Sequence, residues 1–143
     1  PPHPYARSVW YRFLVNKVPI QPLRVKIGRS SSFKCVLCSV SFEDLAHFAL
    51  LCPPKMRLWF DVLECYYPGL SFFPDQLTRF LFHLIVPPLV LDVPRFFTIC
   101  GTALHNIWLA HWRFVVHDQP FLPARLLGSI RSQVDIILTS PTK

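Results

Sequence analysis

Three cysteines and one histidine have the residue types and the spacing of a metal site. Cys35, Cys38, His47 and Cys52 form the pattern C-x2-C-x8-H-x4-C. Two thiols three positions apart can bind one ion from a tight turn, and the imidazole and the third thiol can complete a tetrahedron. Zn²⁺ suits this donor set, because it favours soft thiolates and imidazole and imposes no geometry of its own. Since protein groups fill all four positions, the pattern predicts a structural zinc site and not a catalytic one.

The same residues also have a simpler interpretation. Cys35 and Cys38 could be ordinary core cysteines, and His47 a surface histidine. The neighbouring sequence favours the metal site, because Lys34 directly precedes the first thiol and a nearby cation favours the thiolate form.

A short helix is expected to carry the histidine. Ser41 followed by Asp44 is typical of the start of a helix, which we predict over residues 42–51. Pro53 and Pro54 should stop this helix immediately after Cys52, because proline cannot continue it. The fourth ligand would then lie at a sharp corner of the chain.

The other cysteines and the start of the chain indicate the compartment. Cys65 and Cys100 lie outside any ligand spacing and are predicted to be buried thiols. The chain opens Pro1-Pro2-His3-Pro4, which is unlike a signal peptide, so we expect a reducing intracellular compartment, the cytoplasm or the nucleus. The chain begins without methionine, which is typical of a fragment of a longer protein, although a processed or recombinant start would look the same.

Composition indicates one compact domain, or a small domain with an appendage. The chain has 143 residues, of which 52% are apolar, so a sizeable core can form. We expect a basic helical segment plus the knuckle over residues 1–68 and a helical region over residues 69–143, packed together as one domain. The longest apolar run, residues 80–91, contains two prolines and falls short of the roughly 20 residues that a membrane span requires.

Positive charge is concentrated at the N-terminal end. The formal net charge is +7, yet the first 34 residues contain no acidic residue at all. A basic segment that leads directly into a knuckle favours contact with a polyanion, with RNA or DNA as the first candidate. The alternative is that these are ordinary solvated charges. The basic residues of this segment are Arg7, Arg12, Lys17, Arg24, Lys26, Arg29 and Lys34.

Hydrophobic periodicity predicts a mainly α fold, in which a small CCHC zinc knuckle packs with a multi-helix bundle. Residues 21–27 are ambiguous, because they alternate like a strand while Pro22 and Gly28 suit a two-turn helix. The remaining expected helices cover residues 5–17, 42–51, 54–66, 74–86, 93–117 and a last one from Pro120 to the region of Ser140.

Two tryptophans in the longest predicted helix have competing interpretations. Trp108 and Trp112, with Arg113, could form a stacking surface for single-stranded nucleic acid. Tryptophan at helical spacing is more often a core residue, and we predict that Trp108 is core while Trp112 and Arg113 make the contact. No nucleophile–base–acid trio, glycine-rich phosphate loop or paired acids are evident, so we expect no catalysis by this chain alone.

These features together resemble the reverse transcriptase zinc-binding domain found near the C-terminus of LINE-type, non-LTR retrotransposon proteins. The resemblance covers about residues 8–60, and a weaker one continues to the helix of residues 107–114. It rests on the run from Val9 to Pro19, residues 23–28, Cys35 and Cys38, Glu43, His47-Phe48, Cys52-Pro53 and Trp59. Around the histidine the chain departs from the commonest form in having Ala46 and Ala49-Leu50-Leu51.

The resemblance implies that Cys35, Cys38, His47 and Cys52 are zinc ligands and that the module binds element RNA or target DNA. The polymerase would lie elsewhere in the parent reverse transcriptase, the partner in cis. The alternative is a zinc-stapled module that docks a protein partner through the helices of residues 74–138. Whether the ligand is RNA or DNA and the oligomeric state stay open. The predicted nucleic-acid contacts are Arg7, Arg12, Arg24, Lys26, Arg29, Lys34, Trp112 and Arg113.

Overall fold

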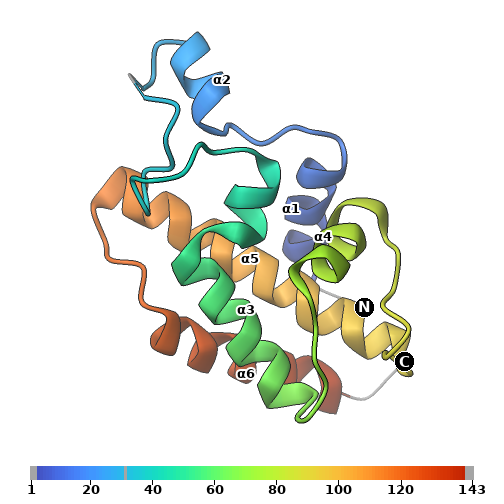
Figure 1. The fold of residues 1–143 in the computed structure, drawn as a ribbon. Helices are drawn as coiled ribbons and strands as arrows, with labels where there is room; N and C mark the ends of the chain where they lie inside the picture. The colour runs from blue at the N-terminus through green and yellow to red at the C-terminus, as the bar shows by residue number, and fades with distance from the viewer. Residues whose placement is uncertain (1–2, 31, 141–143) are drawn as a thin grey trace.

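The protein is mainly helical, as its periodicity predicts, in a computed structural model that describes residues 3–30 and 32–140 (Figure 1). Within these residues, extended pairing is limited to one isolated antiparallel bridge between Lys34 and Phe42. The elements are α1 (Pro4–Leu14), α2 (Gln21–Lys26), the π-helical turn η1 (His47–Leu51), α3 (Pro53–Tyr66), α4 (Pro74–His83), α5 (Val93–His117) and α6 (Pro123–Thr139).

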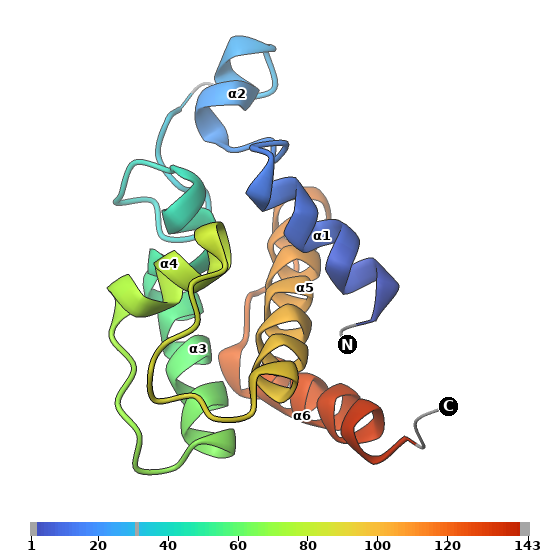
Figure 2. The same ribbon diagram turned by 90° about the vertical axis from the view of Figure 1, so that its right-hand side faces the viewer.

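The helices form a bundle around α5. Helices α1 and α6 both pack along α5, while α3 packs on α6 and on η1. Helix α4 contacts α1 and η1, so helices from both halves of the chain contribute to one buried cluster. Helix α2 and the loop that follows it lie at one end of the bundle, as both views show (Figure 2).

Proline explains where the helices begin. Each of the six α-helices has a proline in its first turn, where the missing N–H costs no hydrogen bond and the fixed φ favours the helix. This includes Pro22 in α2, so the ambiguous segment of residues 21–27 is a helix and not a strand. The Asp92 side chain accepts a hydrogen bond from the N–H of Arg95 and caps α5.

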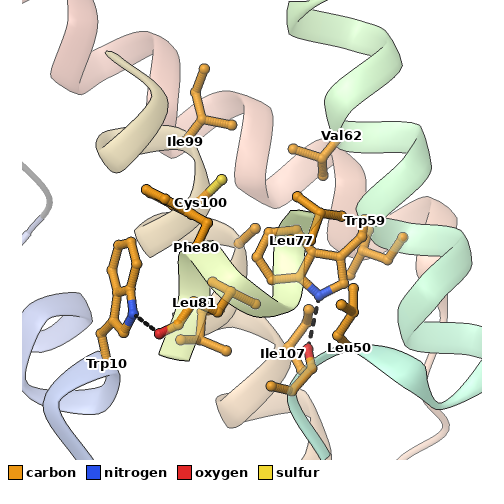
Figure 3. Close-up of a cluster of buried hydrophobic side chains, with 14 of the residues drawn as sticks. Trp10, Leu50, Trp59, Val62, Leu77, Phe80, Leu81, Ile99, Cys100 and Ile107 are labelled. Atoms are coloured by element: carbon orange, nitrogen blue, oxygen red, sulfur yellow. Dashed lines mark hydrogen bonds between the residues drawn. The ribbon is translucent and has the colours of Figure 1, made fainter. Parts of the chain in front are cut away.

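The core is rich in aromatic side chains, and two indoles anchor the backbone of other elements (Figure 3). Nε1 of Trp10 donates to the carbonyl oxygen of Leu81 at 2.7 Å, which fixes α1 against α4. Nε1 of Trp59 donates to the carbonyl oxygen of Ala49 at 2.8 Å, which fixes α3 against η1. Both tryptophans therefore bury a large apolar surface without leaving an indole N–H unsatisfied.

Several predicted helix bounds were wrong. The helix predicted over residues 42–51 is the shorter turn η1 (His47–Leu51), and two helices end early at non-glycine residues in left-handed conformations. Helix α1 ends at Leu14 and not at residue 17, since Asn16 has φ 58°. Helix α4 ends at His83 and not at residue 86, since Leu84 has φ 57°. Helix α6 begins at Pro123 and not at Pro120. The predicted bounds of α5 were confirmed.

Not every large apolar residue of the helices faces the core. Leu14, Phe60 and Leu84 are exposed. In α3 the buried stripe contains Lys55, Leu58 and Trp59. Within residues 3–30 and 32–140, no helix combines the length and the apolar character needed to cross a membrane.

Trp59 and its neighbour Phe60 provide a matched test of this core. Trp59→Ala should lower the free energy of unfolding by about 3–5 kcal/mol, because it removes a fully buried ring and leaves the Ala49 carbonyl without its donor. Phe60→Ala, next to it on α3 and 40% exposed, should cost about 1 kcal/mol or less. Chemical denaturation of the two variants measures both values, and equal losses would contradict this assignment of the buried face.

Candidate metal centre

A tight turn presents the first two candidate ligands. The N–H of Cys35 donates to the carbonyl oxygen of Ser41 at 2.8 Å, and the N–H of Ser39 donates back to the carbonyl oxygen of Cys35 at 2.8 Å. Ser39 has φ 60°, a left-handed conformation that reverses the chain directly after Cys38. Both thiols therefore lie on the inner side of one compact turn.

The π-helical turn η1 presents the other two ligands. The Asp44 carboxylate accepts a hydrogen bond from the N–H of His47 at 2.7 Å, so Asp44 caps this segment itself, in place of the predicted Ser41. The N–H of Cys52 then donates to the carbonyl oxygen of His47, five residues earlier, at 3.2 Å. In an α-helix, residues five apart differ by about 140° in direction. The wider π turn brings His47 and Cys52 closer to the same side.

All four predicted ligands meet at one place. The Sγ atoms of Cys35, Cys38 and Cys52 and a ring nitrogen of His47 all lie within 4.8 Å of one another. The two closest contacts join Sγ of Cys35 to Sγ of Cys52 at 3.9 Å and Sγ of Cys38 to Nε2 of His47 at 3.4 Å. These cysteines are free, since 3.9 Å is far longer than a disulfide bond.

These spacings fit a tetrahedral metal ion. Typical Zn–S and Zn–N bonds place two tetrahedral sulfurs about 3.8 Å apart and a sulfur and a nitrogen about 3.6 Å apart. The observed 3.9 and 3.4 Å are close to both values. The cluster can therefore hold a metal ion with four protein ligands, an arrangement that leaves no coordination position for a substrate.

The protein environment favours the thiolate form that a metal requires. The contact with Cys52, followed by hydrogen bonds from the backbone N–H groups of Cys38 and Leu37, lowers the pKa of Cys35 to about 4 against the effect of burial. The same contact raises the pKa of Cys52, because the close pair shares one proton. A metal ion that replaces this proton would satisfy both sulfurs.

A buried lysine, which the spacing of the ligands does not predict, lies beside the cluster. Nζ of Lys55 donates to the carbonyl oxygen of Phe48 at 2.8 Å and contacts Nδ1 of His111 on α5 at 2.8 Å. Its ammonium also lies over the Phe48 ring, 4.2 Å from the centroid. Burial lowers the pKa of Lys55 to about 8, partly offset by the charges of Cys52 and Cys35.

Lys55 supplies the compensating charge that was predicted for Lys34. Lys34 is exposed, whereas Lys55 is completely buried and its charge lowers the pKa of Cys35. Three thiolates and a divalent ion carry one net negative charge, which one buried ammonium neutralises. Burial and the nearby Lys55 lower the pKa of His111, which keeps its imidazole neutral and able to accept this hydrogen bond. The signal in the sequence was a lysine on the buried stripe of α3.

A second buried polar pair connects α2 to the knuckle. Oε1 of Glu43 accepts a hydrogen bond from the N–H of Gln21 at 2.7 Å, at the start of α2. The Gln21 side chain in turn donates to the carbonyl oxygens of Ser32 and Lys34. Burial raises the pKa of Glu43 to about 7. Glu43, which is also part of the pattern that resembles the zinc-binding domain, therefore positions α2 beside the metal ligands.

Six of the predicted basic contacts fall into two groups. Arg7 and Arg12 line an open groove along α1, together with Tyr11, Val15 and Lys17. The second group surrounds α2 and the knuckle, where Nη2 of Arg24 donates to the carbonyl oxygen of Arg29 at 3.4 Å. Lys26, Arg29 and Lys34, the other members of this group, are all exposed.

The tryptophan pair of α5 lies against the core. Trp108 and Trp112 are both half-buried, with their ring centroids 5.6 Å apart, and both rings pack on Phe48. Nε1 of Trp112 is buried and has no hydrogen-bond partner among the described residues. Arg113 is exposed and lines a hollow between α5 and α6 with Arg125, apart from the groove of α1.

One metal ion per chain is expected, and removal of a ligand should abolish binding. Cys38→Ser or His47→Ala should release the metal and disorder the knuckle segment of residues 33–46, since a structural zinc site contributes on the order of 10 kcal/mol to the folded form. Elemental analysis measures the metal, and limited proteolysis with and without chelator measures the order of the knuckle. Cys65→Ser, a partly buried thiol outside the cluster, is the control and should keep the metal. A metal-free preparation whose knuckle resists proteolysis in chelator would contradict the site.

Lys55 should tune metal affinity without being a ligand. Lys55→Met keeps the apolar stem but removes the compensating charge, so metal affinity should fall by about 10- to 100-fold, as is usual when a group that supports metal ligands is lost. Competition with a chromophoric chelator measures the change. Lys34→Met removes an exposed charge next to Cys35 and should change the affinity much less. Equal affinities for both variants would remove Lys55 from this role.

Comparison with known proteins assigns no family to this arrangement. No protein-family model, curated protein or solved structure matches the chain. The function is therefore argued from the site itself, a four-ligand metal centre at one end of a helical bundle.

Proposed function

We propose that this chain is a zinc-binding accessory domain of a LINE-type reverse transcriptase and that it contacts element RNA or target DNA. The observation that carries the proposal is an exposed basic segment held beside a Cys3His cluster. The resemblance of residues 8–60 to the zinc-binding module of such proteins supports it. The reverse transcription itself would be performed by other parts of the parent protein.

Zinc is the proposed metal because of the donor set. Three thiolates and one imidazole select zinc over magnesium or calcium, which prefer oxygen ligands. With four protein ligands the ion would be structural: it would hold the knuckle turn against η1 and polarise no substrate. Five free thiols also suit a reducing compartment, the cytoplasm or the nucleus.

The charge of the N-terminal third supports a polyanionic ligand. The sequence contains no acidic residue from position 3 to position 42. This segment carries Arg7 and Arg12 on α1 and the four basic residues around α2. The first acid of the chain, Glu43, is buried and hydrogen-bonded to Gln21. The excess of cations at this end of the molecule therefore favours the approach of phosphate groups over the effect of the one exposed acid of the knuckle, Asp44.

A second candidate function, docking of a protein partner, is favoured by one apolar loop. The inner faces of α4, α5 and α6 are occupied in the core, although Val116 and Ile136 on the outer faces are exposed. The loop between α4 and α5 exposes Leu84, Ile85, Leu89 and Leu91, the last to 96%. A partner bound there would be retained at high salt, whereas a nucleic acid would be released.

Salt dependence should identify the basic surface. If about four phosphates are neutralised, log K against log salt should slope by about −3 to −4, at about 0.7 to 0.9 per contact. The triple variant Arg24→Ala, Lys26→Ala, Arg29→Ala should weaken binding evenly across sequences and flatten this slope. Filter-binding titrations against single-stranded and duplex RNA and DNA measure both quantities.

A matched triple variant controls for net charge. Arg57, Arg79 and Arg131 are exposed on α3, α4 and α6, and their replacement by alanine removes the same charge from other helices. This control should leave the affinity nearly unchanged. Equal losses in the two triple variants would assign the binding to net charge alone, and no binding by the parent at low salt would refute the proposed function.

A further inference from the structure

Two phenylalanines of the knuckle stack on each other at the surface. The ring centroids of Phe33 and Phe42 lie 6.0 Å apart, and their planes are 15° from parallel. The two residues are 49% and 60% exposed. Neither phenylalanine belongs to the buried hydrophobic cluster.

The metal-site turn holds this aromatic pair in place. Phe33 and Phe42 lie on the two arms of the turn, which are joined by the bridge between Lys34 and Phe42. The N–H of Glu43 donates to the carbonyl oxygen of Phe33 at 3.1 Å, and the N–H of Cys35 donates to that of Ser41. The four metal ligands close the turn whose backbone carries the two rings. The orientation of the rings is therefore fixed before any partner binds.

The surroundings of the pair are positively charged. Lys34 directly follows Phe33 and is exposed. The Gln21 side chain donates to the carbonyl oxygens of Ser32 and Lys34 and so connects α2 to the segment that carries Phe33. At the other end of α2, the Arg24 side chain donates to the carbonyl oxygen of Arg29. Of the two nearby acids, Glu43 is buried; Asp44 is exposed, and one of its carboxylate oxygens accepts a hydrogen bond from the N–H of His47.

We propose that Phe33 and Phe42 form a stacking site for an unpaired base of single-stranded nucleic acid, with Lys34 and Arg29 on the neighbouring phosphates. A polyanion that also presents flat aromatic faces matches both the rings and the cations. Bases inside a duplex have no free faces, so the site selects single strands. The inference rests on the proposed function and specifies its ligand.

This site replaces Trp112 as the stacking surface. The ring of Trp112 packs against Phe48, Trp108 and His111, and its Nε1 is covered. The Phe33–Phe42 pair is more exposed, and the exposed Lys34 directly follows Phe33 and bridges to Phe42.

The test compares single-stranded with duplex binding in the full chain. A fluorescently labelled single-stranded oligonucleotide and a duplex of the same sequence are titrated at low salt with the parent and with Phe33→Ala, Phe42→Ala and the double variant. The double variant should lose about 5- to 150-fold in single-strand affinity, the range for one stacked base. Its duplex affinity and its salt slope should stay unchanged, because the phosphate contacts remain.

Three controls separate stacking from folding. Metal content should stay at one ion per chain in every variant. The double variant Phe33→Tyr, Phe42→Tyr keeps both rings and should keep the single-strand affinity. Phe73→Ala removes an equally exposed phenylalanine at the start of α4 and should have no effect on binding.

The outcomes distinguish this inference from the proposed function. If the parent binds and the double alanine variant binds single strands equally well, the stacking site is wrong and the basic surface stands. Equal losses for single strands and duplex would also overturn stacking, since the rings would then only support the turn. If the parent binds neither nucleic acid, both proposals fail, and the exposed rings are better explained as a protein-docking surface.

Discussion

The segment between α2 and η1 has almost no hydrophobic core. Its shape therefore depends on the four metal ligands, which hold it against η1. Among residues 27–30 and 32–46, which the structure describes, only Cys35 and Glu43 are buried, and neither contributes much apolar area. The bundle of α1 and α3–α6, in contrast, is filled by large apolar side chains. The two parts are stabilised in different ways: the bundle by burial of apolar surface, the knuckle by coordination and a few backbone hydrogen bonds.

Lys55 is the point at which these two parts meet. Its ammonium contacts η1 through the Phe48 carbonyl and α5 through His111, while its charge acts on the thiols. Burial of an unpaired ammonium is costly, and these contacts together with the negative cluster offset that cost. The metal centre is therefore connected to the longest helix by electrostatics as well as by packing.

Local sequence signals predicted much of the fold and the ligands. Proline in the first turn marked the helix starts, and the four ligands could be identified because each pair is close in sequence. What the sequence did not reveal depends on contacts between distant residues. Lys55 and His111 lie 56 positions apart, and Gln21 and Glu43 lie 22 apart. Left-handed Asn16 and Leu84 were missed because such ends are expected at glycine.

The π-helical turn determines where the chain can change length. Cys52 is hydrogen-bonded to His47 across five residues, so removal of one residue between them would rotate one ligand relative to the other by about 100°. Insertions there would likewise carry a ligand out of the tetrahedron. Only part of the chain between Cys38 and His47 is held by such regular bonds, and its tip around Val40 is exposed. We therefore expect that an insertion near Val40, between the second and third ligands, would disturb the metal site less than one between the third and fourth.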